Sequence, residues 1–152
     1  MDSKQEKLIN SYTTHFNKNF NLAPLQAKIM AYILIMGKKS GVTFEDVLTY
    51  TQASKSSVST TLNSLMDRNS ITYHHKPHDR KKYFTPNKLS SLLERTIRII
   101  QSELLLLVDM IDYYEGIEEN ETDTKQINNI RIYKNHLEGI EVSVRETLQK
   151  LE

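Results

Sequence analysis

Residues 54–84 read SKSSVSTTLNSLMDRNSITYHHKPHDRKKYF, and the first half of this stretch has the pattern of a helix with two unlike faces. Ser54 is suited to cap such a helix, because its side-chain oxygen can accept hydrogen bonds from the N–H groups of the first turn. With about 100° of rotation per residue, the helix that follows, to about Arg68, separates an apolar face from a polar one. The apolar face consists of Val58, Thr61, Leu62 and Leu65, and the polar face of Ser56, Ser59, Thr60 and Asn63. The outer face is therefore short and hydrogen-bonding, and is not a surface of paired Glu and Lys.

The second half of the stretch contains two short segments rich in aromatic and β-branched residues, 71–75 and 82–85. This composition predicts two β-strands. Residues 76–81, Lys-Pro-His-Asp-Arg-Lys, connect the two segments. We therefore expect a hairpin with a basic tip.

A second helix start lies just before this stretch. Thr43 and Asp46 match a capping box in which Asp replaces the usual Glu or Gln, with Val42 and Val47 placed for a hydrophobic staple. This pattern predicts a short helix to about Thr51. Two helices joined by a short turn and followed at once by a basic hairpin have the sequence order of a winged helix-turn-helix.

Further helices are expected towards the N-terminus. In residues 3–19, Leu8, Tyr12 and Phe16 recur every four positions, which indicates one apolar helix face. Residues 24–36 are apolar over most of the surface of a helix, so we expect this helix to be central.

Two long helices are expected towards the C-terminus. The first should run from near Asn87 to about Glu115, where Gly116 can end it. An acidic link, Glu118 to Asp123, leads into the last helix. The apolar residues of this last helix alternate three- and four-residue steps, a pattern typical of a coiled-coil seam. They are Ile127, Ile130, Tyr133, Leu137, Ile140, Val144, Leu148 and Leu151.

The composition agrees with a mainly helical protein. A chain of 152 residues suits one domain, and its 4 Gly and 3 Pro are too few for the many tight turns of a β-sandwich or barrel. The absence of Cys excludes disulfides, thiolate metal sites and a Cys nucleophile. The longest apolar run, 29–36, is too short to cross a membrane, and the N-terminus is too polar for a signal peptide. We expect a cytoplasmic protein with no membrane partner, no metal and no cofactor.

The charge is unevenly distributed, although the net charge is only +1. Residues 54–88 contain seven basic and two acidic residues, a local charge of +5, whereas residues 101–152 contain five basic and twelve acidic residues, a local charge of −7. Because DNA releases counterions when Lys and Arg approach its phosphates, the first segment should be attracted to it.

Sequence patterns typical of catalytic, metal-binding or phosphate-binding sites are weaker than the pattern for DNA binding. Ser57, His74 and Asp79 are the residue types of a Ser-His-Asp catalytic triad. However, a role in helix capping explains the serine, and no strand-turn-helix nucleophile elbow surrounds any of the three. His74 and His75 are adjacent in a predicted strand and should point to opposite faces, so they cannot readily share a metal ion. Residues 37–40 lack the glycine spacing of a phosphate-binding loop. We do not expect an enzyme.

Residues 54–84, with their SKSSVS and DRK-Y-F elements, resemble the recognition helix and wing of MarR-type transcriptional regulators, particularly the GbsR-like branch. The resemblance implies a homodimer whose first, fifth and sixth helices interlock, with the fourth helix in the major groove of DNA and the wing at the minor groove or the backbone. It implies one domain over 1–152, with dimerisation helices in 1–36 and 87–152 and a DNA-binding lobe in 37–86. The common wing of the family reads Asp-x-Arg, whereas here Arg80 follows Asp79 directly.

The candidate DNA-binding residues lie on the polar helix face and in the wing. Asn63 suits an adenine edge, because its amide both donates and accepts hydrogen bonds. Arg80 suits a narrow, electronegative minor groove, and Asp79 should orient Arg80 or the turn. Lys81 and Lys82 should contact phosphate. The full set is Lys55, Ser56, Ser57, Ser59, Thr60, Asn63, Lys76, His78, Arg80, Lys81 and Lys82.

An effector pocket is a further implication of the resemblance. Tyr12, Phe16, Tyr32 and Tyr113 lie on helices that surround such a pocket in this family, and aromatic rings suit a choline-like quaternary ammonium. Ordinary core or dimer packing is the alternative for these residues.

We predict a homodimeric, sequence-specific double-stranded DNA-binding regulator, a repressor that occupies a pseudo-palindromic operator and can respond to a small molecule. The alternative is a helical protein–protein interaction module that uses the winged-helix fold without an operator.

Overall fold

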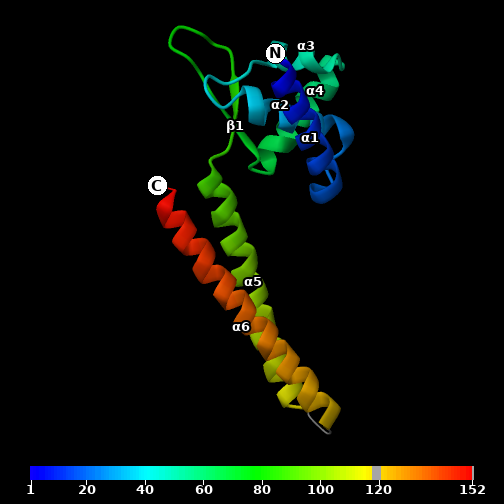
Figure 1. Ribbon diagram of the computed structural model, residues 1–152, viewed down its shortest axis with the longest axis vertical. Coiled ribbons are helices and arrows are strands. Elements are labelled where there is room, and N and C mark those ends of the chain that lie inside the picture. Colours follow the sequence, from blue (N-terminus) through cyan, green and yellow to red (C-terminus); the bar gives the residue numbers. More distant parts are fainter. Residues whose placement is uncertain (118–120, 152) are drawn as a thin grey trace. The chain divides into compact units, whose positions relative to one another are not determined.

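The computed structural model describes residues 1–117 and 121–151, and the side chains of residues 121 and 122 are not described. It is mainly α-helical with one two-stranded antiparallel sheet, which confirms the predicted fold class (Figure 1). The chain divides into two compact units, Met1–Asn87 and Lys88–Glu152. Most of the expected acidic link, Glu118 to Asp123, lies outside the described residues.

The first unit has the predicted order of a winged helix-turn-helix. Its elements are α1 (Ser3–Phe20), α2 (Pro24–Met36), α3 (Phe44–Thr51), α4 (Lys55–Asp67), β1 (Ile71–His74) and β2 (Tyr83–Pro86). In the hairpin, Ile71 lies opposite Pro86 and His74 opposite Tyr83. The predicted strand limits were wrong by one residue, because His75 and Lys82 belong to the connecting loop.

The core of the first unit forms around α2. Ala27, Ile29, Ala31 and Ile33 are fully buried, which confirms that this helix is central. They lie on several sides of the helix, as expected of a helix that is covered all round. The core is completed by residues of α3, α4 and the hairpin, including Val47, Val58, Leu62, Leu65, Ile71 and Phe84.

The predicted apolar face of α1 was wrong in part. Leu8 is 45% exposed and Tyr12 36% exposed, whereas Ile9 is fully buried. Each step of four residues rotates by about 40° beyond a full turn, so a stripe with this spacing drifts around the helix. Ile9 is about 100° from Leu8 but only about 20° from Phe16, and of the predicted stripe Phe16 packs against the core.

The helix starts form as the sequence predicts. The Thr43 hydroxyl accepts from the N–H of Asp46 at 3.2 Å, and an Asp46 carboxylate oxygen accepts from the N–H of Thr43 at 2.8 Å, which completes the capping box. At α4 the Ser54 hydroxyl accepts from the N–H of Ser57 at 3.1 Å. These contacts satisfy N–H groups that have no partner within the helix.

The second unit is a hairpin of two long helices, α5 (Leu89–Glu115) and α6 (Glu121–Lys150), which run side by side (Figure 1). Ile100, Leu107 and Leu137 form its buried centre. The predicted seam of α6 is confirmed at Leu137, whereas Tyr133 is 43% exposed. Tyr133 lies at the edge of the seam, where its hydroxyl donates to a Glu103 carboxylate oxygen at 2.9 Å.

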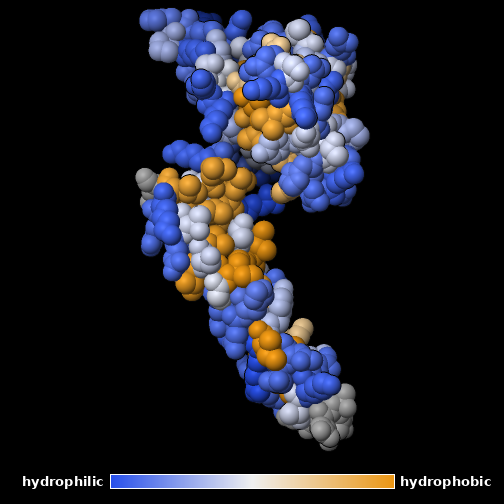
Figure 2. Space-filling model, in the orientation of Figure 1, coloured by the Kyte–Doolittle hydropathy of each residue, from blue (hydrophilic) through white to orange (hydrophobic). Residues whose placement is uncertain are grey.

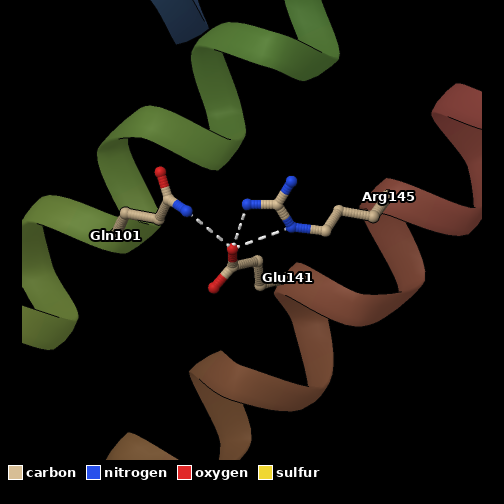
Figure 3. A network of polar contacts seen from close by, with 3 residues as sticks. All are labelled: Gln101, Glu141 and Arg145. Carbon is tan, nitrogen blue, oxygen red and sulfur yellow. Dashed lines mark hydrogen bonds and ion pairs between the residues drawn. The ribbon is translucent and has the colours of Figure 1, made fainter.

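A polar network also joins the two helices (Figure 3). The same carboxylate oxygen of Glu141 accepts from the Gln101 side-chain amide of α5 at 2.9 Å and from Arg145, one turn along α6, at 2.6 Å. A carboxylate that is shared by donors on both helices favours one alignment of the hairpin. Within the described residues, neither this helix pair nor any other helix offers a stretch long and apolar enough to cross a bilayer.

Candidate nucleic-acid interface

The outer face of α4 is exposed and polar. Ser56, Ser59, Thr60 and Asn63 are exposed, whereas Val58 and Leu65 are fully buried on the opposite face. This separation matches the predicted helix faces. The buried face fixes α4 to the core, so its polar face is presented by a rigid support.

The N-terminus of α4 carries a cluster of hydroxyl groups. The Ser54 hydroxyl lies 3.0 Å from that of Ser56 and 2.8 Å from that of Ser57. Ser57 is thus held to the cap, whereas Lys55 is exposed and its ammonium makes no hydrogen bond or ion pair with a described residue. The start of a helix also carries partial positive charge, so this end of α4 is electrostatically suited to a phosphate.

Asp79 organises the tip of the wing, residues 75–82. One of its carboxylate oxygens accepts from the N–H of Lys81 at 2.8 Å, and the other accepts from the Tyr83 hydroxyl at 2.7 Å. The Asp79 N–H donates to the carbonyl of Lys76 at 3.1 Å. The bonds from the Lys81 N–H and the Tyr83 hydroxyl lower the pKa of Asp79 from its usual value, and the bond to Asp79 raises the pKa of Tyr83. Asp79 therefore holds the turn, and no ion pair joins it to Arg80 within the described residues.

Two lysines of the wing lie over tyrosine rings. The Lys76 ammonium is 3.8 Å from the centre of the Tyr83 ring, and the Lys82 ammonium is 4.2 Å from the centre of the Tyr73 ring. Attraction between a cation and the face of a ring holds such side chains in place. Arg80 is also exposed, but unlike the two lysines its side chain lies over no aromatic ring of the described residues and makes no hydrogen bond or ion pair with them.

A hollow of about 240 Å³ lies between the start of α3, one side of α4 and the wing. Its rim includes Ser59 and Asn63 from α4 and Lys81 and Lys82 from the wing, so the structure brings four of the predicted residues to one place. Its lining consists of Phe44, Glu45, Ser59, Leu62, Asn63, Met66, Lys81, Lys82 and Phe84. Lys55, Lys76, His78 and Arg80 are not part of it.

Two residues of this surface were not predicted from the sequence. Glu45 contributes a carboxylate to the rim of the hollow, and Tyr83 holds Asp79. Glu45 is one residue after Phe44 in the predicted helix start, but only the fold places it beside α4. Tyr83 stands in a predicted strand, and its partners depend on the register of the hairpin.

The residues considered for catalysis and metal binding contact different neighbours and do not form one site among the described residues. His74 stacks on Tyr83 with ring centres 5.8 Å apart, and His75 Nδ1 lies 3.1 Å from the carbonyl oxygen of Lys81. Ser57 belongs to the cap of α4, and no hydrogen bond joins it to His74 or Asp79 in the part of the chain that the structure describes. Over the same residues there is no group of three side chains suited to hold a metal ion.

The aromatic residues proposed for an effector pocket lie in different clusters. Tyr12 and Phe16 are neighbours on α1, with ring centres 5.7 Å apart. Tyr32 instead stacks on Tyr50 of α3 at 4.2 Å, and its pKa is raised chiefly by burial. Tyr113 belongs to the second unit, where it contacts Tyr114. Phe16 and Tyr32 both pack against the core of the first unit.

No protein-family model and no curated protein matches the chain. Among solved structures, the chain is similar to a crystal structure of a transcriptional regulator, with a TM-score of 0.70 and 16% sequence identity over 97% of both chains. It is also similar to MepR, a transcription regulator of the Staphylococcus aureus multidrug efflux pump MepA, with a TM-score of 0.44 and 14% identity over 88% of this chain and 93% of MepR. For MarR the TM-score is 0.42, with 16% identity over 88% of this chain and 94% of MarR. The first similarity shows a shared fold.

Proposed function

We propose that the chain is a sequence-specific double-stranded DNA-binding transcriptional regulator. The observation that carries this proposal is the hollow whose rim joins Asn63 on α4 to Lys81 and Lys82 in the wing. A helix with an exposed polar face beside a basic hairpin is the arrangement with which winged helices contact the major groove and the neighbouring backbone. The fold shared with a transcriptional regulator supports the same function.

The contacts divide by chemistry. Ser59, Thr60 and Asn63 present hydroxyl and amide groups that can hydrogen bond to base edges in the major groove. Lys55, together with the hydroxyls of Ser56 and Ser57 at the start of α4, is placed for phosphate. In the wing, Arg80 is the candidate for the minor groove, with Lys76, His78, Lys81 and Lys82 adding positive charge.

The proposed regulator acts as a homodimer through its long helices. On α5, Leu92, Ile99, Leu106 and Tyr113 recur every seven residues and are 47%, 56%, 66% and 64% exposed. This stripe lies about 100° around the helix from the residues that face α6, and its spacing is that of a coiled-coil seam. Figure 2 shows apolar side chains gathered over the end of the hairpin where α5 begins and α6 ends. A second copy would cover such an exposed apolar surface.

The resemblance to MarR-type regulators supports the finer parts of the proposal. In it, residues 37–86 form the DNA-binding lobe, residues 1–36 and 87–152 contribute to dimerisation, and the dimer represses transcription by occupying a pseudo-palindromic operator. The resemblance to the GbsR-like branch supports control by a quaternary ammonium compound. A thermal-shift screen of such compounds and aromatic acids tests this control, and the absence of any stabilising compound would refute it.

Selection of bound duplexes from a random DNA pool tests the main proposal. We expect enrichment of a pseudo-palindrome whose half-sites are about 10 base pairs apart or a multiple of that distance. Failure to enrich any sequence, even at low salt, would refute the proposal and favour the alternative, a winged-helix module that binds protein.

A further inference from the structure

Tyr83, the first residue of β2, contacts three other residues of the hairpin and its loop. Its hydroxyl donates to Asp79 at 2.7 Å. The Lys76 ammonium lies 3.8 Å from the centre of its ring, and the His74 imidazole stacks on the ring with an interplanar angle of 25°.

The Tyr83 contacts continue through Asp79 to the tip of the wing. The carboxylate that accepts from the Tyr83 hydroxyl also accepts from the N–H of Lys81 at 2.8 Å. Arg80 lies between these two anchored residues, so its backbone is held on both sides while its side chain remains exposed. Just before Asp79, His78 has a φ of 63°, a left-handed conformation that an L-residue adopts at some cost and that the closed turn maintains.

We propose that Tyr83 is a positioning residue of the DNA interface, which acts through Asp79 to hold Arg80 and Lys81 in the conformation that meets DNA. The inference rests on the proposed function. A loop that is ordered before binding loses less conformational entropy on binding, so part of the affinity of the wing comes from a residue that need not touch DNA.

The opposite pKa shifts of the two partners agree with this contact. The bond from the Lys81 N–H is the main cause of the lowered pKa of Asp79 and the bond from the Tyr83 hydroxyl is the second, whereas the bond to Asp79 is the main cause of the raised pKa of Tyr83. Both shifts favour the pair in which a neutral phenol donates to a carboxylate.

Tyr83→Phe tests the proposal, because it removes the hydroxyl and keeps the ring under Lys76. Tyr73→Phe is the matched control: the Tyr73 ring also carries a lysine, Lys82 at 4.2 Å, and its hydroxyl makes no hydrogen bond with a described residue. With the duplex selected by the wild type, we expect Tyr83→Phe to weaken binding about fivefold, the equivalent of one hydrogen bond, and Tyr73→Phe to leave it unchanged. Asp79→Asn should cause a similar loss, and adding Tyr83→Phe to it should cause little more.

Tyr83→Phe in a variant that lacks the positioned side chains separates a positioning role of Tyr83 from a general structural role. In a background with both Arg80→Ala and Lys81→Ala, Tyr83→Phe should no longer change the affinity, because the side chains that it positions are absent. In the DNA-free protein, Tyr83→Phe should also accelerate hydrogen exchange of the Lys81 amide, whereas Tyr73→Phe should not.

Each contrary result has a distinct meaning. If the wild type selects no sequence, the proposed function fails and the role of Tyr83 fails with it. If the wild type selects an operator and Tyr83→Phe binds it as tightly, or loses the same affinity in the Arg80→Ala, Lys81→Ala background, only the positioning role is overturned.

Discussion

The side chains of the proposed interface differ in what holds them before DNA arrives. Lys76 and Lys82 lie over tyrosine rings, whereas Arg80 and Asn63 make no hydrogen bond or ion pair with a described residue. A side chain that already has a partner gains less from a contact with DNA than one that exchanges only water. We therefore expect Arg80 and Asn63 to contribute more to recognition than the two lysines.

Asn63→Ala should relax the preference for one base pair in the selected site. The side chain is exposed on α4 and offers both a donor and an acceptor, so its loss should reduce discrimination at that position by about 1–3 kcal/mol. Lys55→Ala on the same helix is the contrasting variant and should weaken binding to all sequences, with the slope of log affinity against log salt reduced by about 1. Repeated selection from the random pool provides the measurement. A wild-type motif selected by Asn63→Ala would refute the role of Asn63.

The Tyr83 phenol should titrate above its usual pKa of 10.0, because ionisation would break its bond to the Asp79 carboxylate. The raised pKa means that the stability from this bond is fully present below pH 10.0 and is lost as the pH rises through the shifted value. Towards acid pH, the lowered pKa of Asp79 determines the limit. The stability from this bond is present above the usual pKa of 3.8 and is lost as the pH falls through the shifted value. A ring-resonance titration of Tyr83 by NMR should therefore move towards 10.0 in Asp79→Asn. An unchanged titration would contradict the bond.

Among the helices and strands, the features that could be predicted were those that depend on residues close together in the sequence. The caps at Thr43 and Ser54 and the two faces of α4 depend on residues within one or two turns, so the sequence was enough. The buried side of α1 and the limits of the strands depend on the packing of other elements. The contacts of Tyr83 depend on the hairpin register that places His74 opposite it, and composition alone does not determine a register.

Gly41 lies in the loop between α2 and α3, and this loop should need glycine there in order to pack against the hairpin. Its φ is +74°, and an added Cβ would lie 2.7 Å from the Tyr83 Cβ and 3.2 Å from His74 Cε1. Gly41→Ala should lower the free energy of unfolding by about 1–3 kcal/mol.

Gly139→Ala is the control, because nothing lies within 4 Å of an added Cβ in the middle of α6. It should raise the free energy of unfolding by about 0.5–1 kcal/mol through helix propensity. Chemical denaturation of both variants provides the measurement. A neutral Gly41→Ala would show that the loop does not approach the hairpin this closely.

At the scale of the whole molecule, the net charge of +1 is the sum of unlike parts. The +5 of residues 54–88 and the −7 of residues 101–152 suit a protein that meets DNA with one surface and is repelled elsewhere. The exposed stripe on α5 provides an apolar surface for self-association. The division of charge was visible in the sequence, whereas which apolar residues of α5 face α6 and which remain exposed required the structure.

Leu106→Glu should shift the protein from dimer to monomer, because it places a charge in the middle of the exposed stripe, where Leu106 is 66% exposed. Sedimentation velocity measures this shift. The variant should also lose affinity for the full palindrome while it binds a single half-site as the wild-type monomer does. A Leu106→Glu protein that remains dimeric would show that this stripe is not the interface.

Amide hydrogen exchange with and without the selected duplex tests whether α4 and the wing together contact DNA. We predict that the duplex slows exchange at the start of α4, residues 55–63, and across the wing, residues 75–83. Slower exchange confined to the α5–α6 hairpin, with α4 and the wing unchanged, would show that α4 and the wing do not contact DNA.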